Sequence, residues 1–239
     1  MLLAVAGFAT TPHTEWWSQG NKMYAAKQYA EAAEYYSKIA ALNPHDEEVY
    51  YNLGNAYYRL NNISMAVLNY EKALKIDPDH KEAADNLLIT QSRIKNRIST
   101  APDIFFVRWW NAWTSSAKAT MWAVLSLLVF LSIIAVLALS RMGKLKKLPP
   151  SSIFISSLVL CCLLVLAFAA AINKTANDRA VVMQADIRMM SNPGGGGKQQ
   201  AVVPEGTTVV LLGEQAGWAE VQLPDGRTGY VQKDALTKI

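Results

Sequence analysis

Four consecutive glycines followed by a lysine, Gly194 to Lys198, are the segment that most resembles a site for chemistry. A phosphate-binding loop cradles phosphates with glycine N–H groups and places Ser or Thr directly after its lysine, where the hydroxyl reaches the metal ion. Here Gln199 follows the lysine, and the glycines are not spaced as such a loop requires. The segment therefore predicts a turn and not a nucleotide site.

The histidines and cysteines are not spaced as metal ligands or nucleophiles either. His13, His45 and His80 each lack a second metal-type residue at helical spacing, so we expect them to be surface loop residues. Cys161 and Cys162 are neighbours in an apolar run, and neighbours on a helix project about 100° apart. No serine lies in a G-x-S-x-G turn. We therefore expect no catalytic residue, no metal, no cofactor and no enzymatic activity.

The charge distribution separates the chain into three parts. Charged residues make up 18% and hydrophobic residues 51% of the sequence, whereas an average soluble domain has roughly 25% charged residues. The net charge is −1 over residues 1–98, +6 over 99–174 and −1 over 175–239. Positive charge around an apolar segment is typical of membrane proteins and not of a nucleic-acid-binding face. We expect no nucleic-acid partner.

Two apolar stretches are long enough to cross a bilayer, which takes about 20 residues. Both are free of charged residues, so we predict transmembrane helices at 119–140 and 150–172, with the lipid bilayer as a partner. The connection at 141–147 carries four basic residues and is expected in the cytoplasm, with both ends of the chain on the opposite side. Aromatic and basic residues at 103–113 predict an interfacial helix ahead of the first span.

The first residues, MLLAVAGFA, form an apolar stretch that ends in small residues. It lacks a basic n-region and is shorter than a usual secretory signal. We interpret residues 1–12 as the end of a signal peptide that starts upstream. The alternative is an apolar N-terminus that is retained.

Internal repetition is clearest at residues 47–80, EEVYYNLGNAYYRLNNISMAVLNYEKALKIDPDH. Large residues on one predicted helix face small residues on the other, and a proline ends the second helix. The packing positions are Tyr50, Leu53, Gly54 and Tyr57 on the first helix, Ala66, Tyr70 and Ala73 on the second, and Pro78 at its end. This pattern of about 34 residues is that of a tetratricopeptide repeat. Residues 81–98 then supply a capping helix.

A second copy of the repeat precedes this one without a gap, at residues 13–46. The matching positions are Trp16, Gly20, Ala32, Tyr36 and Pro44. Two abutting copies in register predict a short helical solenoid.

The last sixty or so residues change from helical to strand patterning. Short β-type runs alternate with turn residues such as Pro224-Asp225-Gly226, which predicts five short strands in a small barrel over residues 179–239. The segments that carry a resemblance to bacterial SH3 domains are Ile187-Arg188, Glu205-Gly206-Thr207, Gly217-Trp218 and Asp225 to Val231. The resemblance implies an SH3-like barrel with an aromatic binding surface.

The expected fold is thus multidomain, with an all-α tetratricopeptide solenoid, a two-helix transmembrane hairpin and an all-β SH3-like barrel. This order of modules resembles the BatE family, the repeat-bearing membrane proteins of the Bacteroides aerotolerance cluster. The resemblance covers nearly the whole chain. It implies an envelope complex linked to stress or oxygen tolerance, with von Willebrand-type membrane proteins as partners and no established catalytic chemistry. Together with the predicted topology, it implies a bacterial inner-membrane protein with N- and C-terminal domains in the periplasm.

Two functional hypotheses follow from this organisation. In the first, the chain is a scaffold that holds protein partners through exposed side chains on the first helices of its repeats: Trp17, Asn21, Tyr24, Tyr51, Asn55 and Tyr58. Rings and amides suit an extended or helical segment of a partner. The alternative for Tyr51 and Tyr58 is packing within the solenoid. In the second hypothesis, the SH3-like domain recognises peptidoglycan peptide or a proline-rich segment through Trp218 and Tyr230.

Overall fold

The chain forms two compact units in the computed structural model, which describes residues 12–100, 109–110, 113–114, 118–143, 149–175 and 178–239. The first unit contains the described residues up to 100 together with 178–239, and the second contains those between 109 and 175. Nearly all of the predicted signal-like start, and most of the predicted interfacial helix and basic loop, lie outside the described residues. The first unit therefore joins two segments that are far apart in the sequence.

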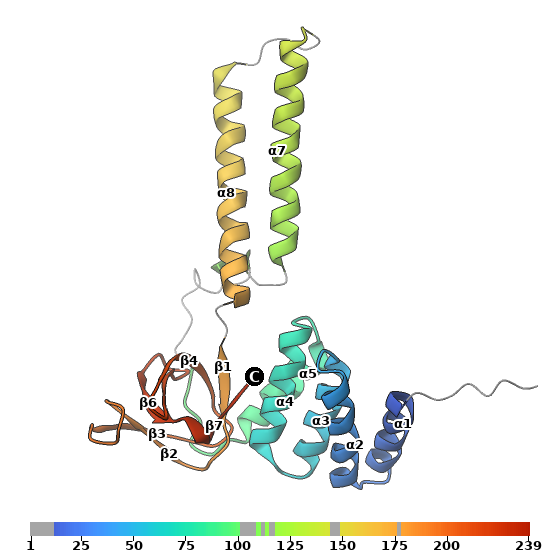
Figure 1. Ribbon diagram of the computed structural model, residues 1–239, viewed down its shortest axis with the longest axis vertical. Coiled ribbons are helices and arrows are strands. Elements are labelled where there is room, and N and C mark those ends of the chain that lie inside the picture. The colour runs from blue at the N-terminus through green and yellow to red at the C-terminus, as the bar shows by residue number, and fades with distance from the viewer. Residues whose placement is uncertain (1–11, 101–108, 111–112, 115–117, 144–148, 176–177) are drawn as a thin grey trace, which may run out of the picture. The chain divides into compact units, whose positions relative to one another are not determined.

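Five helices make up two helix–turn–helix pairs and a capping helix: α1 (Pro12–Ala25), α2 (Tyr29–Leu42), α3 (Glu47–Arg59), α4 (Ile63–Ile76) and α5 (Lys81–Ser92). They lie side by side in sequence order (Figure 1). Asp46, Asn62 and His80 cap the last three helices, because each side chain accepts a backbone N–H of the first turn. Lys27 and Asn61 take the left-handed conformation that turns the chain within each pair.

Each helix pair packs a tyrosine of its second helix against a glycine of its first. A Cβ placed on Gly20 would lie 2.7 Å from the Tyr36 ring, and one placed on Gly54 would lie 2.6 Å from the Tyr70 ring. Both tyrosines are buried. Glycine lets the two helices approach at these points because any side chain would overlap a ring that the core holds in place.

The capping helix ends at Ser92, so the prediction of a helix through residue 98 is wrong. After Ser92 the chain turns through Asn96, whose φ is +53°. On either side of this turn, Ile94 lies against Gly206 and Ile98 packs against the core of the C-terminal sheet. The helix gives way because these two apolar side chains contact the sheet.

Seven strands form one antiparallel sheet: β1 (Arg179–Val182), β2 (Ile187–Met190), β3 (Gln199–Val203), β4 (Thr208–Gln215), β5 (Trp218–Gln222), β6 (Thr228–Gln232) and β7 (Leu236–Lys238). Their order is β3-β2-β6-β5-β4-β1-β7, so β3 and β7 are the two ends and the sheet does not close into a barrel. The predictions of five strands and of a barrel are therefore corrected. The β7 end pairs with β1 and continues into Ile239, which contacts the helical core instead of β3.

The sheet packs against the second repeat within the first unit. Ala180 and Val182 of β1 point into the core of the sheet. Val181, between them, points to the opposite side, as successive strand residues do, and joins the hydrophobic cluster of α4 and α5. One strand thus contributes to two cores. The sequence predicted the repeats and the sheet as separate modules, and the structure shows a shared interface.

The second unit consists of α7 (Ala119–Arg141) and α8 (Pro150–Thr175), which lie next to each other (Figure 1). In the most apolar window of each helix the mean hydropathy is 2.8 and only 6% of the residues are buried. The indole N–H of Trp122, in the first turn of α7, donates to the carbonyl of Trp113, and the two rings stack with their centroids 5.5 Å apart. Both helices are long and apolar enough to cross a membrane.

Candidate partner-binding surfaces

The rings predicted to bind a partner are half-buried and lie on α1 and α3. Trp17 stacks on His13 at 6.4 Å and meets the edge of Tyr36. Tyr24 contacts Tyr29 edge-on at 5.2 Å between ring centroids. Burial raises the pKa of Tyr24, which keeps its hydroxyl neutral as a hydrogen-bonding group.

Tyr51 and Tyr58 both pack against the core cluster of the second repeat. The Tyr51 ring lies 4.9 Å from the His80 ring, and the Arg93 guanidinium lies 5.0 Å from the centre of the Tyr58 ring. Both rings keep part of their surface exposed. They therefore have packing contacts of the kind that the alternative interpretation expected, together with surface that a partner can reach.

The two predicted binding asparagines form hydrogen bonds inside the repeats. The amide oxygen of Asn21 accepts from the Tyr36 hydroxyl at 2.7 Å. The amide oxygen of Asn55 accepts from the Tyr70 hydroxyl at 2.7 Å and from the Asn86 amide at 2.9 Å. These bonds give each of the two tyrosine hydroxyls an acceptor. The asparagines thus support the aromatic residues, a role that sequence reasoning missed.

Burial also raises the pKa of the two tyrosines that these amides hold. The pKa of Tyr36 rises to about 12, and that of Tyr70 is raised as well, with desolvation as the largest cause in both. Their hydroxyls therefore remain neutral donors at any physiological pH.

His80 is buried, so the prediction of a surface histidine is wrong at this position, whereas His45 is exposed. The Nδ1 atom of His80 accepts the backbone N–H of Ala83 and caps α5. Its Nε2 atom has no hydrogen-bond partner among the described residues, and the nearest carboxylate oxygen, on Glu48, is 3.6 Å away. His80 is buried because the Tyr51 ring packs over its imidazole.

Trp218 and Tyr230 lie on one face of the sheet. Trp218 and Glu220 alternate with buried residues of β5, and Glu220 is paired with Tyr230 of β6. Directly paired residues point to the same side, so both rings are on the face away from the core. A Cβ placed on Gly195 would lie 3.9 Å from the Trp218 ring. The glycine-rich segment is therefore a turn beside this tryptophan.

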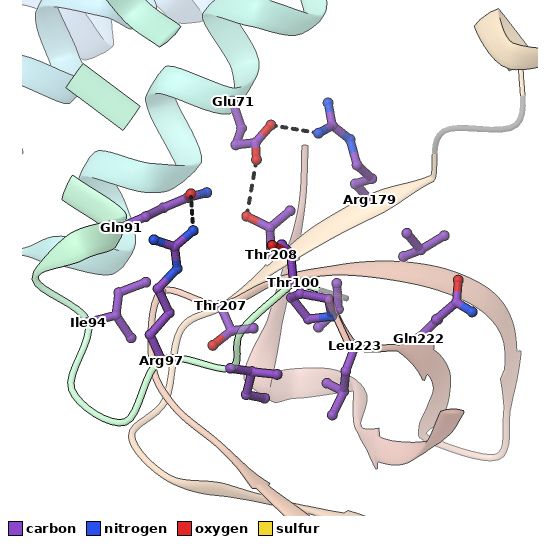
Figure 2. Close-up of a pocket in the computed structure, with 15 residues that line it drawn as sticks. Glu71, Gln91, Ile94, Arg97, Thr100, Arg179, Thr207, Thr208, Gln222 and Leu223 are labelled. Carbon is purple, nitrogen blue, oxygen red and sulfur yellow. Dashed lines mark hydrogen bonds and ion pairs between the residues drawn. The ribbon is translucent and has the colours of Figure 1, made fainter. Parts of the chain in front are cut away.

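Ion pairs and hydrogen bonds join the repeats to the sheet around Val181. The buried carboxylate of Glu71 pairs with Arg179 at 2.8 Å and accepts a hydrogen bond from Thr208 at 3.1 Å (Figure 2). Two further hydrogen bonds join the same surfaces: the Ser64 hydroxyl donates to the Glu205 carboxylate at 2.6 Å, and the Lys75 ammonium donates to the carbonyl of Ile239 at 2.6 Å. A carboxylate buried in an interface requires such partners because desolvation costs several kcal/mol.

A sequence signal for this interface was present in α4. Met65 to Leu68 are four consecutive apolar residues and so cover more than one face of a helix. In the structure the helix is buried around most of its circumference, at Ser64, Ala66, Val67, Leu68, Asn69, Tyr70, Glu71 and Ala73. A helix that is apolar on more than one face is covered on more than one face. The packing positions predicted for this helix lie only on its face toward the first helix of the repeat.

Within the described residues, no group of three His, Cys, Asp or Glu side chains is placed to hold a metal ion.

Comparison with known families identifies two of these modules. The tetratricopeptide repeat family matches residues 47–80. The bacterial SH3 domain family matches residues 184–237. No curated protein matches the chain. The chain therefore contains a tetratricopeptide repeat and a bacterial SH3 domain, and between them two helices that could span a membrane.

Proposed function

We propose that this chain is a membrane-anchored adaptor and not an enzyme, and that its repeats hold a protein partner. The observation that carries the proposal is the match of residues 47–80 to a tetratricopeptide repeat whose first helix presents the half-exposed rings of Tyr51 and Tyr58. Stacked helix pairs form extended surfaces for other proteins. Partly exposed aromatic rings add large contact area at low entropic cost.

The two apolar helices support a membrane location for the adaptor. The basic connection between them favours a hairpin whose turn faces the cytoplasm, with the repeats and the SH3 domain in the periplasm of a bacterial inner membrane. The resemblance to the BatE family extends this proposal to an envelope complex for stress or oxygen tolerance. Its protein partners would then be von Willebrand-type membrane proteins.

A second candidate function is supported by the face of the SH3 domain that carries Trp218 and Tyr230 beside the glycine turn. On this proposal the chain senses cell-wall peptide or another extended peptide. A binding assay tests this second function: the full-length chain in detergent is incubated with isolated peptidoglycan, and its retention is measured. Retention of the wild type that is lost in Trp218→Ala supports the second function. If neither the wild type nor the variant is retained, the second function is contradicted.

Co-purification from crosslinked membranes tests the adaptor function. The double variant Trp17→Ala, Tyr58→Ala should lose the protein partner and keep its helical content. Asn55 stays unchanged, because it holds the buried Tyr70 hydroxyl and its loss would disturb the fold. Tyr35→Ala is the matched control, since Tyr35 is a half-exposed ring on α2, away from the first helices. Recovery of the partner at full yield with the double variant would overturn the proposal.

Labelling in cells tests the topology. Ser37→Cys and Thr228→Cys place single thiols at exposed positions of the repeat and of the sheet, in a background without Cys161 and Cys162. Both should react with an impermeant maleimide once the outer membrane is opened. Reaction only after the inner membrane is broken contradicts a periplasmic location.

A further inference from the structure

A cavity of about 250 Å³ lies where the segment after the capping helix meets the sheet (Figure 2). One side is formed by α4, the end of α5 and the segment that follows it. The other side is formed by β1, β4 and the end of β5. All of these elements belong to the first unit. A ligand in this cavity would therefore contact both the repeats and the SH3 domain.

Among the described residues that line the cavity, one cation has no carboxylate to neutralise its charge. Arg179 is paired with Glu71, whose other oxygen accepts from Thr208. The Arg97 guanidinium, in contrast, contacts only the neutral amide oxygen of Gln91, at 3.3 Å, and no carboxylate among the described residues pairs with it. Arg97 is exposed, and Figure 2 shows it directed toward Gln91 at the edge of the cavity. Its planar guanidinium suits a carboxylate, which it can bind through two N–H groups.

The rest of the wall combines apolar side chains with the polar Thr100, Thr207 and Gln222. Ile94 and Ile98 line it from the repeat side, and Val209 and Leu223 line it from the sheet side. Ile94, Val209 and Leu223 are buried, so they are held in position by the two cores. An aliphatic group that entered the cavity would leave water and gain contacts on several sides.

We propose that this cavity binds a small carboxylate that carries one aliphatic group, with the carboxylate on Arg97 and the aliphatic group among Ile94, Val209 and Leu223. A free acylated amino acid and the C-terminal residue of a peptide share this chemistry. Sites for drug-sized ligands measure about 300–1,000 Å³. The smaller cavity therefore suits a ligand of one or two residues. The binding is separate from the adaptor function, because it uses neither the rings of the repeats nor those of the sheet.

Titration of the full-length chain in detergent with N-acetylleucine and with N-acetylleucinamide tests the proposal. The two probes differ only in the group that Arg97 would bind, which is a charged carboxylate in the first and a neutral amide in the second. We expect N-acetylleucine to bind at least tenfold more tightly than the amide by isothermal titration. N-acetyl-Ala-Gly-Ala-Leu distinguishes the two sources: binding as tight as that of N-acetylleucine indicates a site for peptide ends, and much weaker binding indicates a site for a small molecule.

Arg97→Gln should remove the preference for the carboxylate and leave the circular dichroism spectrum unchanged. Arg227→Gln is the matched control, since Arg227 is an exposed arginine on the turn between β5 and β6 and pairs with Asp225. It should bind N-acetylleucine as the wild type does. Equal affinity for both probes, or a preference that survives Arg97→Gln, overturns the proposal. Neither result bears on co-purification of the protein partner.

Discussion

The two repeats contain the same internal contacts in different surroundings. In each, a glycine admits a buried tyrosine ring, and an asparagine one residue after that glycine accepts the tyrosine hydroxyl. The first repeat has one neighbouring helix pair, whereas the second lies between the first repeat, the capping helix and the sheet. Comparing the two repeats therefore separates what the repeat pattern requires from what tertiary contacts add.

The difference is concentrated on the outer face of the second helix. Four residues of α4 that are buried or bonded to the sheet are Ser64, Leu68, Glu71 and Lys75. One repeat length earlier, the corresponding residues of α2 are Ala30, Glu34, Ser37 and Ala41, all of them exposed. The outer face of α2 is thus small and polar because it meets solvent. The outer face of α4 supplies a buried acid and an apolar side chain because it meets the sheet.

The largest difference should appear when the glycines are replaced by leucine. Gly54→Leu forces a side chain into the Tyr70 ring and should lower the free energy of unfolding by about 3 kcal/mol, the upper part of the usual overpacking cost. Gly20→Leu should cost less, because α2 has no sheet behind it and can move away from α1. Chemical denaturation of the full-length chain in detergent measures both. Equal costs would show that the surroundings of α4 do not restrict it.

Removal of the guanidinium at the interface should have the next largest effect. Arg179→Ala leaves the buried Glu71 carboxylate with only Thr208 and should cost about 2 kcal/mol, as expected for a hydrogen bond to a charged group. Arg227→Ala, at an exposed ion pair, should cost about 0–1 kcal/mol.

A double-mutant cycle with Glu71→Gln completes this test. If Arg179 acts through Glu71, Arg179→Ala should cost much less in the Glu71→Gln background. Additive costs would contradict a direct pairing.

The asparagines should differ by a smaller amount. Asn55→Ala removes the acceptor of a buried hydroxyl and the partner of Asn86, and should cost about 1.5 kcal/mol. Asn21 is exposed, so water can replace its oxygen next to Tyr36 and the cost of Asn21→Ala should be below about 1 kcal/mol. Thermal unfolding followed by circular dichroism compares the two. A larger loss of stability for Asn21→Ala than for Asn55→Ala would contradict the expectation that water replaces the Asn21 oxygen.

The last expected effect is absent at neutral pH and appears only at alkaline pH. Burial raises the pKa of Tyr36 from 10.0 to about 12 and raises that of Tyr70, so the neutral form is favoured in the folded state. Stability should therefore stay constant up to about pH 10 and fall as the pH rises toward 12, because the unfolded chain releases these protons first. The combined variant Tyr36→Phe, Tyr70→Phe should flatten this decline, and Tyr35→Phe should not. A decline that is unchanged in the combined variant would assign it to other groups.

The sequence by itself determined the local elements of this protein. Spacing of glycine, alanine and tyrosine predicted the helix pairs, and the left-handed Asn61 and the capping residues Asp46 and Asn62 lie where the chain turns between them. The apolar stretches predicted two long helices, and turn residues predicted the strand-rich end. These signals are local, because helix and strand periods and turn chemistry depend on neighbouring residues.

Only the tertiary structure decided how the N-terminal repeats and the C-terminal sheet meet. It brought Glu71 to Arg179 and Thr208, divided the residues of β1 between two cores, buried His80, ended the capping helix at Ser92 and turned Asn55 toward Tyr70. Each of these outcomes depends on which surface covers a given face. For Glu71, β1 and the end of α5, that surface comes from a segment beyond two apolar helices, whereas His80 and Asn55 are covered by other helices of the repeats. Periodicity marks a face as apolar or polar, but it does not identify the partner that buries it.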